Sequence, residues 1–250
     1  MHNKIAFITG ATSGIGAVYA REFASQGYDL IITGRRAEKI KALADELMAQ
    51  HKINIEVVIA ELANNDDLDL LIKKIADHNN IEILINNAGF GQRGNFHTVD
   101  LKIYENMLNV HDLATMKLTH AVLPSMLANK KGSIINVSSV VAFIPFTNNA
   151  VYAGSKAFIN LFTEAISTEL KGTGVQVQVL CPGLTATDVF EKMGENVEEV
   201  AKQRNWFWTY MSAEAVVAKS LKCLAKNKVI CIPGFRNKLM IIWRTLGRLF

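Results

Sequence analysis

A tyrosine and a lysine four residues apart offer the clearest acid–base chemistry in this sequence. Tyr152 and Lys156 lie in the segment Tyr-Ala-Gly-Ser-Lys, and residues four apart on a helix share one face. A phenol titrates near about 10 in water, which is too high for base chemistry at neutral pH. A neighbouring ammonium group favours the phenolate and lowers its pKa. The spacing therefore predicts a tyrosine that gives or takes a proton.

A serine upstream completes the candidate catalytic set. Ser139 lies shortly before the tyrosine in the sequence. We expect its hydroxyl to hold a substrate oxygen while Tyr152 transfers the proton, and we expect Lys156 also to reach the ribose of a cofactor. A Tyr/Lys pair at this spacing is usually structural on its own. The interpretation therefore depends on the cofactor motifs that come earlier in the chain.

A glycine-rich turn follows the first predicted strand. Residues Thr9–Gly16 read TGATSGIG, a GxxxGxG spacing rather than the commoner GxGxxG. Glycines permit unusual dihedral angles and let the backbone approach a pyrophosphate at the start of a helix. The turn is therefore expected to bind a dinucleotide. The residues expected to bind it are Gly10, Thr12, Ser13, Gly14, Ile15 and Gly16.

The end of the second predicted strand indicates which dinucleotide is bound. An acidic residue there would bind the ribose hydroxyls of NAD(H) and repel a 2′-phosphate. Here the strand ends in Arg35 and Arg36. Guanidinium groups form charge-assisted bonds to phosphate, so NADP(H) is the predicted cofactor, with Arg35 the stronger candidate. The alternative is that both arginines are solvated residues at a helix start.

Two further strand ends are candidates for cofactor contacts. Asn86–Gly89 reads Asn-Asn-Ala-Gly, and its small residues leave room for the adenine side and the cofactor ribose. The expected contacts come from Asn87, Ala88 and Gly89. Glu61 and Leu62 end the third predicted strand, where an acidic side chain can meet the adenine amino group.

These motifs lie in a regular alternation of apolar β-rich runs and helical stretches. The runs are continuously apolar, as in parallel strands that are covered on both faces. The alternation predicts right-handed crossovers and a Rossmann-like, doubly wound α/β fold with a parallel sheet flanked by helices, in a single domain over residues 1–250. Strands are expected at Lys4–Thr9, Tyr28–Thr33, Asn54–Ile59, Ile81–Asn86, Ser133–Val137, Val175–Leu180 and Val229–Ile232. Helices are expected at 14–26, 37–51, 66–78, 100–128, 150–171 and 212–227.

The composition is that of a globular protein and excludes several other classes. Apolar residues make up 50% of the chain, and the net charge is +4 with scattered basic residues, which argues against nucleic-acid binding. The three cysteines lack metal-ligand spacing and predict buried free thiols, and no metal site is expected. Without a cleavable signal sequence or a long apolar span, we expect a soluble cytoplasmic protein.

The motifs together resemble the classical short-chain dehydrogenase/reductase family over essentially the whole chain. The matching segments are Thr9–Gly16, Asn86–Gly89, Ser139, Tyr152–Lys156 and Pro182-Gly183 followed by Thr187. The resemblance implies a seven-stranded parallel sheet and hydride transfer between a nicotinamide and a carbonyl or alcohol. It also implies a homodimer or homotetramer built through the long helices around 100–128 and 150–171. Further cofactor contacts implied by the resemblance are Pro182, Gly183, Thr185 and Thr187.

One position departs from the family's pattern. Members commonly carry an asparagine in the long helix, whose backbone helps to hold a water next to the lysine. The register set by Leu118-Thr119 and Leu123-Pro124 places His111 at that position. Asn109 is two residues early and points to a nearly opposite face. His111 can serve through its main-chain carbonyl, join a proton relay through its imidazole, or only fill the space.

Two segments bear on the substrate and on partners. Residues 185–212 predict a lid over an apolar pocket, and hence a hydrophobic carbonyl or alcohol substrate, unless they pack at a subunit interface. Residues 236–250 form a basic amphipathic tail that packs over the partner subunit or the pocket, or makes weak peripheral contact with an anionic membrane. The lid's apolar residues are Phe190, Met193, Trp206, Phe207, Trp208, Tyr210 and Met211.

The residues leave two classes of function open. The first is an NADP(H)-dependent oxidoreductase, which the intact Ser139, Tyr152 and Lys156 favour. The second is a catalytically weak dinucleotide-binding regulatory or scaffold protein, for which the departure at His111 leaves room. A sugar-nucleotide epimerase or dehydratase of the related extended type is disfavoured, because the chain has little room for an additional substrate domain.

Overall fold

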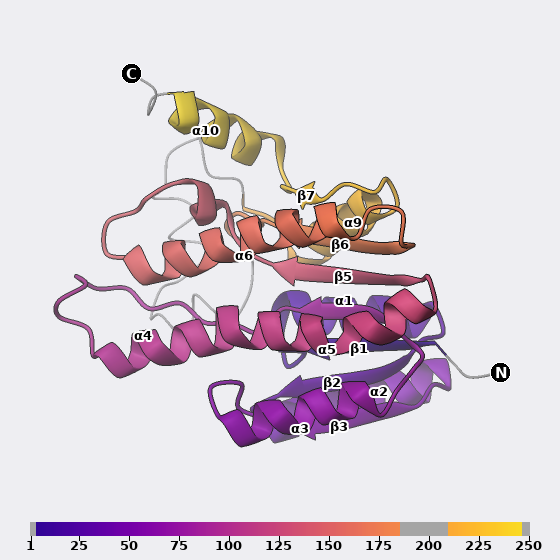
Figure 1. Ribbon diagram of the computed structural model, residues 1–250. Coiled ribbons are helices and arrows are strands. Elements are labelled where there is room, and N and C mark those ends of the chain that lie inside the picture. Colours follow the sequence, from indigo (N-terminus) through magenta and orange to yellow (C-terminus); the bar gives the residue numbers. More distant parts are fainter. Residues whose placement is uncertain (1–3, 186–209, 247–250) are drawn as a thin grey trace.

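The fold is a seven-stranded parallel sheet between two layers of helices (Figure 1). It is taken from a computed structural model that describes residues 4–185 and 210–246. The strand order is β3-β2-β1-β4-β5-β6-β7, and every strand pair is parallel. The direction of winding reverses between β1 and β4, which is where ligands bind in open α/β sheets. The predicted doubly wound, seven-stranded fold is confirmed.

The elements lie close to their predicted positions. The strands are β1 (Ile5–Thr9), β2 (Asp29–Gly34), β3 (Ile55–Ile59), β4 (Ile81–Asn86), β5 (Gly132–Val137), β6 (Val175–Leu180) and β7 (Ile230–Cys231). The helices are α1 (Gly14–Ser25), α2 (Ala37–His51), α3 (Asn65–Ala76), α4 (Leu101–Leu108), α5 (Ala114–Ala128), α6 (Ala150–Glu169), α9 (Ala213–Leu224) and α10 (Phe235–Leu246). A π-helical turn, η1 (Asn109–Leu113), and a short 3-10 helix, η2 (Val140–Phe143), complete the set.

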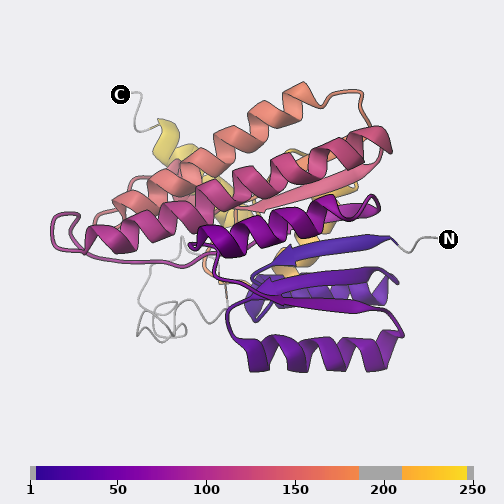
Figure 2. The same cartoon turned by 60° about the horizontal axis from the view of Figure 1, so that its bottom comes forward.

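The continuous apolar runs of the strands reflect burial on both faces of the sheet. In β1, Ala6 and Ile8 point to the face covered by α1, α2 and α9, while Ile5 and Phe7 point to the face covered by α3 and α5. Helix α6 lies beside α4 on this second face (Figure 2). Because all the strands are parallel, their carboxyl ends and the loops that follow them lie at one edge of the sheet.

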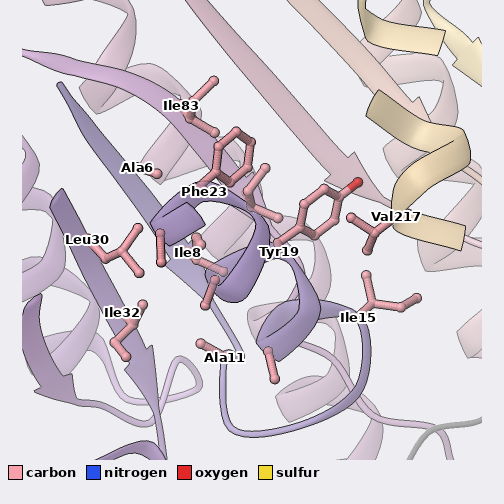
Figure 3. Close-up of a cluster of buried hydrophobic side chains, with 14 of the residues drawn as sticks. Ala6, Ile8, Ala11, Ile15, Tyr19, Phe23, Leu30, Ile32, Ile83 and Val217 are labelled. Carbon is pink, nitrogen blue, oxygen red and sulfur yellow. The ribbon is translucent and has the colours of Figure 1, made fainter. Parts of the chain in front are cut away.

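The core on the α1 face joins the first helix to α9, in the C-terminal part of the chain. Tyr19 and Phe23 of α1 pack in a cluster with Val217 of α9 (Figure 3). The hydroxyl of Tyr19 donates to Ser220 Oγ at 2.6 Å, a bond between residues 201 positions apart. The same serine donates to Gln178 of β6. Helix α9 is thereby fixed over the first helix of the chain.

The long helix expected over 100–128 is interrupted in the structure. It consists of α4, the π-helical turn η1 and α5. A π-helical turn accommodates an extra residue and is frequently found at functional sites. His111 lies in this turn and is buried. The sequence pattern gave no sign of the interruption, because the hydrophobic spacing continues through it.

The structure describes the two ends of the predicted lid and most of the predicted tail. Thr185 and Met211 form an isolated parallel bridge, so the ends of the 185–212 segment meet, while residues 186–209 lie outside the described part of the chain. The tail begins with helix α10, which packs against η2. In the described part of the chain, no helix has both the length and the apolar character needed to cross a membrane.

Candidate functional site

A cavity of about 440 Å³ lies at the carboxyl edge of the sheet. Its lining comes from the segments that follow β1 to β6, together with η1 and α6. The predicted site residues that line it are Gly10, Thr12, Ser13, Gly14, Ile15, Arg35, Arg36, Glu61, Leu62, Asn87, Ala88, Gly89, His111, Ser139, Tyr152, Lys156, Pro182, Gly183 and Thr185. Gly16 is buried beside the cavity, and Thr187 lies outside the described residues.

The glycine-rich turn after β1 is packed too closely to accept side chains. Gly10 has φ +68°, and a Cβ there would lie 2.8 Å from Ala88 Cα. A Cβ on Gly16 would lie 2.4 Å from the carbonyl oxygen of Gly10. The turn therefore stays free of side chains at these positions, and Gly10 and Gly14 line the cavity where α1 begins, as pyrophosphate binding at a helix N-terminus requires. The turn fits a dinucleotide.

Asn87 and Thr9 hold the ends of β1 and β4 together. The side-chain amide of Asn87 donates to the carbonyls of Thr9 and Gly10 at 3.0 and 3.1 Å. Thr9 Oγ1 accepts bonds from the backbone amides of Asn87 and Ala88. The sequence predicts Asn87 as a cofactor contact, whereas in the structure its amide group bonds to the backbone of the glycine-rich turn. Its side chain shapes the turn.

The two arginines after β2 differ in their surroundings. Arg36 donates to the hydroxyls of Thr12 and Ser13 at 2.8 and 2.6 Å, which brings it to the glycine-rich turn. Arg35 forms an exposed ion pair with Glu61 at 2.7 Å. No acidic residue directly follows β2 in the sequence, but in the structure Glu61, from the end of β3, lies beside Arg35. Of the two arginines, Arg36 lies against the turn.

Ser139, Tyr152 and Lys156 come together as predicted. Lys156 is buried, and its Nζ lies 5.7 Å from the centre of the Tyr152 ring. The Nζ donates to the carbonyl of Val137 at the end of β5, at 3.0 Å. Ser138 Oγ donates to the Lys156 carbonyl at 2.9 Å and so ties the start of α6 to the same strand end. The three candidate catalytic side chains therefore share one wall of the cavity.

Burial dominates the acidities of these groups. Burial raises the pKa of Tyr152, and a hydrogen bond with Ser139 lowers it. Burial also lowers the pKa of Lys156 to about 8, an effect that the charge of Asp112 opposes. The predicted lowering of the phenol pKa by Lys156 is therefore not the main effect here. Ser139 is the neighbour that favours the phenolate.

His111 forms a buried bridge between two segments of the site. Its Nε2 accepts from the backbone amide of Phe90 at 3.1 Å, and its Nδ1 lies 2.9 Å from Ser155 Oγ. The Ser155 hydroxyl donates to the carbonyl of Tyr152. Because Nε2 accepts, the proton must lie on Nδ1, which then donates to Ser155.

This bridge bears on the three roles considered for His111. Burial, with a smaller contribution from the charge of Lys156, holds its pKa well below the usual value, so the imidazole is neutral. Its ring nitrogens contact the Phe90 amide and the Ser155 hydroxyl, and neither contact is with the Tyr152 hydroxyl or the Lys156 ammonium, so the geometry shows a positioning role. The imidazole does more than fill space, because it joins Phe90, directly after the Asn-Asn-Ala-Gly segment, to the start of α6.

Asp112 is a charged neighbour of Lys156 that the sequence analysis did not identify. Its Oδ1 is buried and has no hydrogen-bond partner among the described residues. Burial raises the pKa of Asp112 to about 7, and the charge of Lys156 acts in the opposite direction. The signal present in the sequence was an acidic residue directly after His111.

Comparisons with known proteins agree with this architecture. Residues 4–198 match the family model described as short chain dehydrogenase. The NADP-dependent 3-hydroxy acid dehydrogenase of Escherichia coli O6:H1 is 33% identical over 191 residues, which cover 76% of this chain and 75% of that protein.

Two solved structures extend the likeness to nearly the whole chain. A short-chain dehydrogenase from Sphingobium yanoikuyae in complex with NADPH has a TM-score of 0.87 at 29% identity, covering 98% of this chain and 93% of that one. The bulky-bulky ketone specific alcohol dehydrogenase from Comamonas testosteroni has a TM-score of 0.83 at 28% identity, covering 100% and 94%. This chain belongs to the classical short-chain dehydrogenase/reductase family and is an NAD(P)-linked oxidoreductase of alcohol and carbonyl groups.

Proposed function

We propose that this enzyme interconverts a hydrophobic ketone or aldehyde and its alcohol with NADP(H), using Tyr152 as proton donor and acceptor. The observation that carries the proposal is the convergence of Ser139, Tyr152 and Lys156 on one cavity that Arg35 and Arg36 also line. A scaffold protein would have no need to retain this set of side chains around a dinucleotide site.

The roles of the residues follow from their positions. The nicotinamide supplies or accepts the hydride. Ser139 binds the substrate oxygen and, by hydrogen bonding to Tyr152, favours its ionised form. Tyr152 gives its proton to that oxygen during reduction and takes it back during oxidation. Lys156, positioned by Val137, supplies the positive charge beside the tyrosine.

The preference for NADP(H) rests on the arginines after β2. Arg36 lies against the turn proposed to bind pyrophosphate, and Arg35 is close by on the exposed side. A 2′-phosphate would compete with Glu61 for Arg35. The E. coli relative is named as NADP-dependent, and the Sphingobium enzyme is in complex with NADPH.

The hydrophobic substrate class is supported by the apolar part of the cavity lining. Apolar side chains there include Phe90, Val140, Val141, Phe146 and Leu184. One observation favours a second class, since Arg93 also lines the cavity and can bind a carboxylate. The relative that acts on 3-hydroxy acids fits this alternative.

A substrate panel tests the proposed reaction. Bulky hydrophobic ketones and short 3-oxo acids are assayed with NADPH, using wild type, Arg93→Ala and Tyr152→Phe. We expect turnover of the ketones that Arg93→Ala retains and Tyr152→Phe reduces by at least a hundredfold. Turnover of the short 3-oxo acids alone, lost in Arg93→Ala, would contradict the hydrophobic substrate class and support an acidic substrate. Tight NADPH binding without turnover above Tyr152→Phe would favour the scaffold.

A second set of variants tests the cofactor. Removing a charge-assisted bond to phosphate costs about 1.5–3 kcal/mol, so Arg36→Ala should lower kcat/KM for NADPH roughly ten- to a hundredfold. The value for NADH should change little. Glu61→Gln removes the ion pair with Arg35 and should raise kcat/KM for NADPH modestly. Equal losses with both cofactors in Arg36→Ala would contradict the proposed preference.

A further inference from the structure

Helix α10 has one face buried against the protein. Met240 and Ile241 are buried in a cluster with Val140 and Ile144, which lie in and next to η2. Asn237 is also buried, and its amide donates to the carbonyl of Pro233 at 2.7 Å. These contacts hold the helix in a fixed orientation on the body of the protein.

Asn237 connects this helix to the cofactor side of the cavity. A Cβ placed on Gly183 would lie 2.5 Å from Asn237 Nδ2, so the amide packs directly on the backbone after β6. Gly183 lines the cavity, as does Val140. Helix α10 is therefore the outer support of one cavity wall.

The opposite face of α10 is an exposed apolar stripe. Phe235, Leu239, Ile242 and Trp243 are 73%, 47%, 55% and 68% exposed. Their spacing of i, i+4, i+7 and i+8 places them on one side of the helix. Large aromatic and aliphatic side chains in one contiguous stripe mark an interaction surface rather than scattered surface apolar residues.

Cations border this apolar stripe on both sides. At about 100° per residue, Arg236 falls on one flank of the stripe and Lys238 on the other. Both side chains are exposed. The sequence from 235 to 250 contains four basic residues and no acidic one. An apolar stripe with cationic flanks is the pattern of a helix that lies in the interface of an anionic bilayer.

We propose that the exposed stripe of α10 docks this protein onto an anionic lipid surface. The helix has 12 residues and is about 18 Å long, which is too short to cross the hydrocarbon core of about 30 Å, so it lies along the surface. It is positioned for this at the outside of the molecule, beyond the β7 edge of the sheet (Figure 1).

Charge favours lipid over a second copy of the chain. A two-fold symmetric contact through this stripe would bring the cationic flanks of both copies into one interface. Like charges at an interface are destabilising, whereas anionic headgroups neutralise them. Lipid docking also brings the cavity wall at Val140 near the bilayer. Delivery of an apolar substrate from the membrane would follow, and that consequence alone rests on the proposed function.

Vesicle co-sedimentation tests the docking directly. The full chain is mixed with vesicles of phosphatidylcholine alone or with phosphatidylglycerol. We expect pelleting only with the anionic vesicles, and roughly tenfold weaker binding for Leu239→Glu and for Lys238→Glu. The matched controls are Leu70→Glu and Lys73→Glu on α3, which make the same changes at exposed positions of another helix and should bind as wild type.

A spectroscopic readout places the contact at the stripe. In a Trp206→Phe/Trp208→Phe background, Trp243 is the remaining tryptophan, and its emission should shift to the blue with anionic vesicles. Equal binding to phosphatidylcholine, or unchanged binding by Leu239→Glu, would overturn the proposal. A third outcome would also overturn it: wild type does not bind vesicles, and Leu239→Glu has a lower oligomeric mass than wild type. That result would assign the stripe to a contact with a second copy of the chain. None of these measurements depends on turnover.

Discussion

The buried imidazole of His111 shows how a substitution at a family position can change a residue's role. An asparagine is common there, and this chain uses the longer ring to reach two partners at once. One is the backbone amide of Phe90, after β4, and the other is Ser155, within the first turns of α6. His111 is therefore a positioning residue that fixes the cofactor side of the cavity relative to Tyr152.

Two variants separate positioning from proton transfer. Glutamine carries both an acceptor and a donor, so His111→Gln should retain most activity. His111→Leu leaves the Phe90 amide without its acceptor, at about 1–3 kcal/mol, and removes the contact with Ser155, which keeps its bond to the Tyr152 carbonyl; kcat/KM should fall by ten- to a hundredfold. The pH–rate profile should keep its shape in both variants. An altered apparent pKa in the pH–rate profile of His111→Gln would instead support a proton relay through the imidazole.

Lys156 should limit the stability of the fold. Its pKa is about 8 in the folded chain and 10.5 in the unfolded one, so the unfolded state binds the proton more tightly. The shift corresponds to about 3 kcal/mol, and the lost bond to Val137 offsets part of it. Lys156→Met should therefore be inactive yet more stable than wild type at pH 7.

The sign of this effect gives a pH test. Between pH 8 and 10.5, the contribution of Lys156 to the free energy of unfolding should become less unfavourable as pH rises, because the folded chain has already lost the proton that the unfolded chain retains. The comparison with Lys156→Met isolates this contribution, because the buried thiols of Cys181 and Cys231, whose pKa values burial raises, act in the opposite direction in both proteins. Denaturant titrations should show the advantage of Lys156→Met shrinking from pH 7 to pH 10. A difference in the free energy of unfolding that stays constant with pH would mean that burial does not lower the pKa of Lys156.

At this scale the sequence predicted which residues meet, but not how each is bonded. Ser139, Tyr152 and Lys156 were placed by motif spacing alone. The ion pair of Arg35 with Glu61 joins the ends of two adjacent strands, and no local pattern indicates it. The partners of His111 and the buried oxygen of Asp112 likewise depend on packing between distant segments.

Among the elements, the contact of α10 with the loop after β6 links the tail to the cavity. A methyl group at Gly183 would overlap the Asn237 amide. Asn237 is fully buried, so it has little room to move. Gly183, predicted as a cofactor contact, thus also provides the packing surface for Asn237 of α10.

A glycine pair tests this contact. Gly183→Ala should destabilise the protein by about 1–3 kcal/mol through overpacking. Gly154→Ala, on α6, has open space around the new methyl and should stabilise by about 0.5–1 kcal/mol. Adding Asn237→Ala to Gly183→Ala should recover part of the loss, measured by thermal unfolding. Additive losses would show that the two residues do not interact.

The sequence predicted most elements within a few residues of their ends. Helix α10 was foreseen only as a basic amphipathic stretch, because its two apolar faces become distinct only when one packs on η2. The π-helical turn was missed because hydrophobic spacing cannot distinguish an extra residue in a continuous helix.

For the molecule as a whole, the helical layer of α4, α5 and α6 exposes a second apolar surface. The exposed large apolar residues on these helices include Leu101, Leu108, Met116, Phe158 and Leu161. These are the helices through which the predicted homo-oligomer would form. A surface of this kind is rarely left uncovered in a soluble protein.

We expect wild type to sediment as a dimer or tetramer, and Leu161→Glu to shift it to a lower mass by placing a charge in the contact. Leu70→Glu, on α3, should leave the mass unchanged. A monomeric wild type at micromolar concentration in analytical ultracentrifugation would exclude the predicted oligomer.

The bond between Tyr19 and Ser220 has a consequence for biosynthesis. During translation α1 emerges early, but the helix that covers Tyr19 and Phe23 is among the last to be made. Until then the nascent chain presents an unfinished apolar surface, and contacts this remote in sequence form slowly. Ribosome-bound chains that stop short of α9 should therefore recruit chaperones and aggregate on release, while chains that extend past it should not.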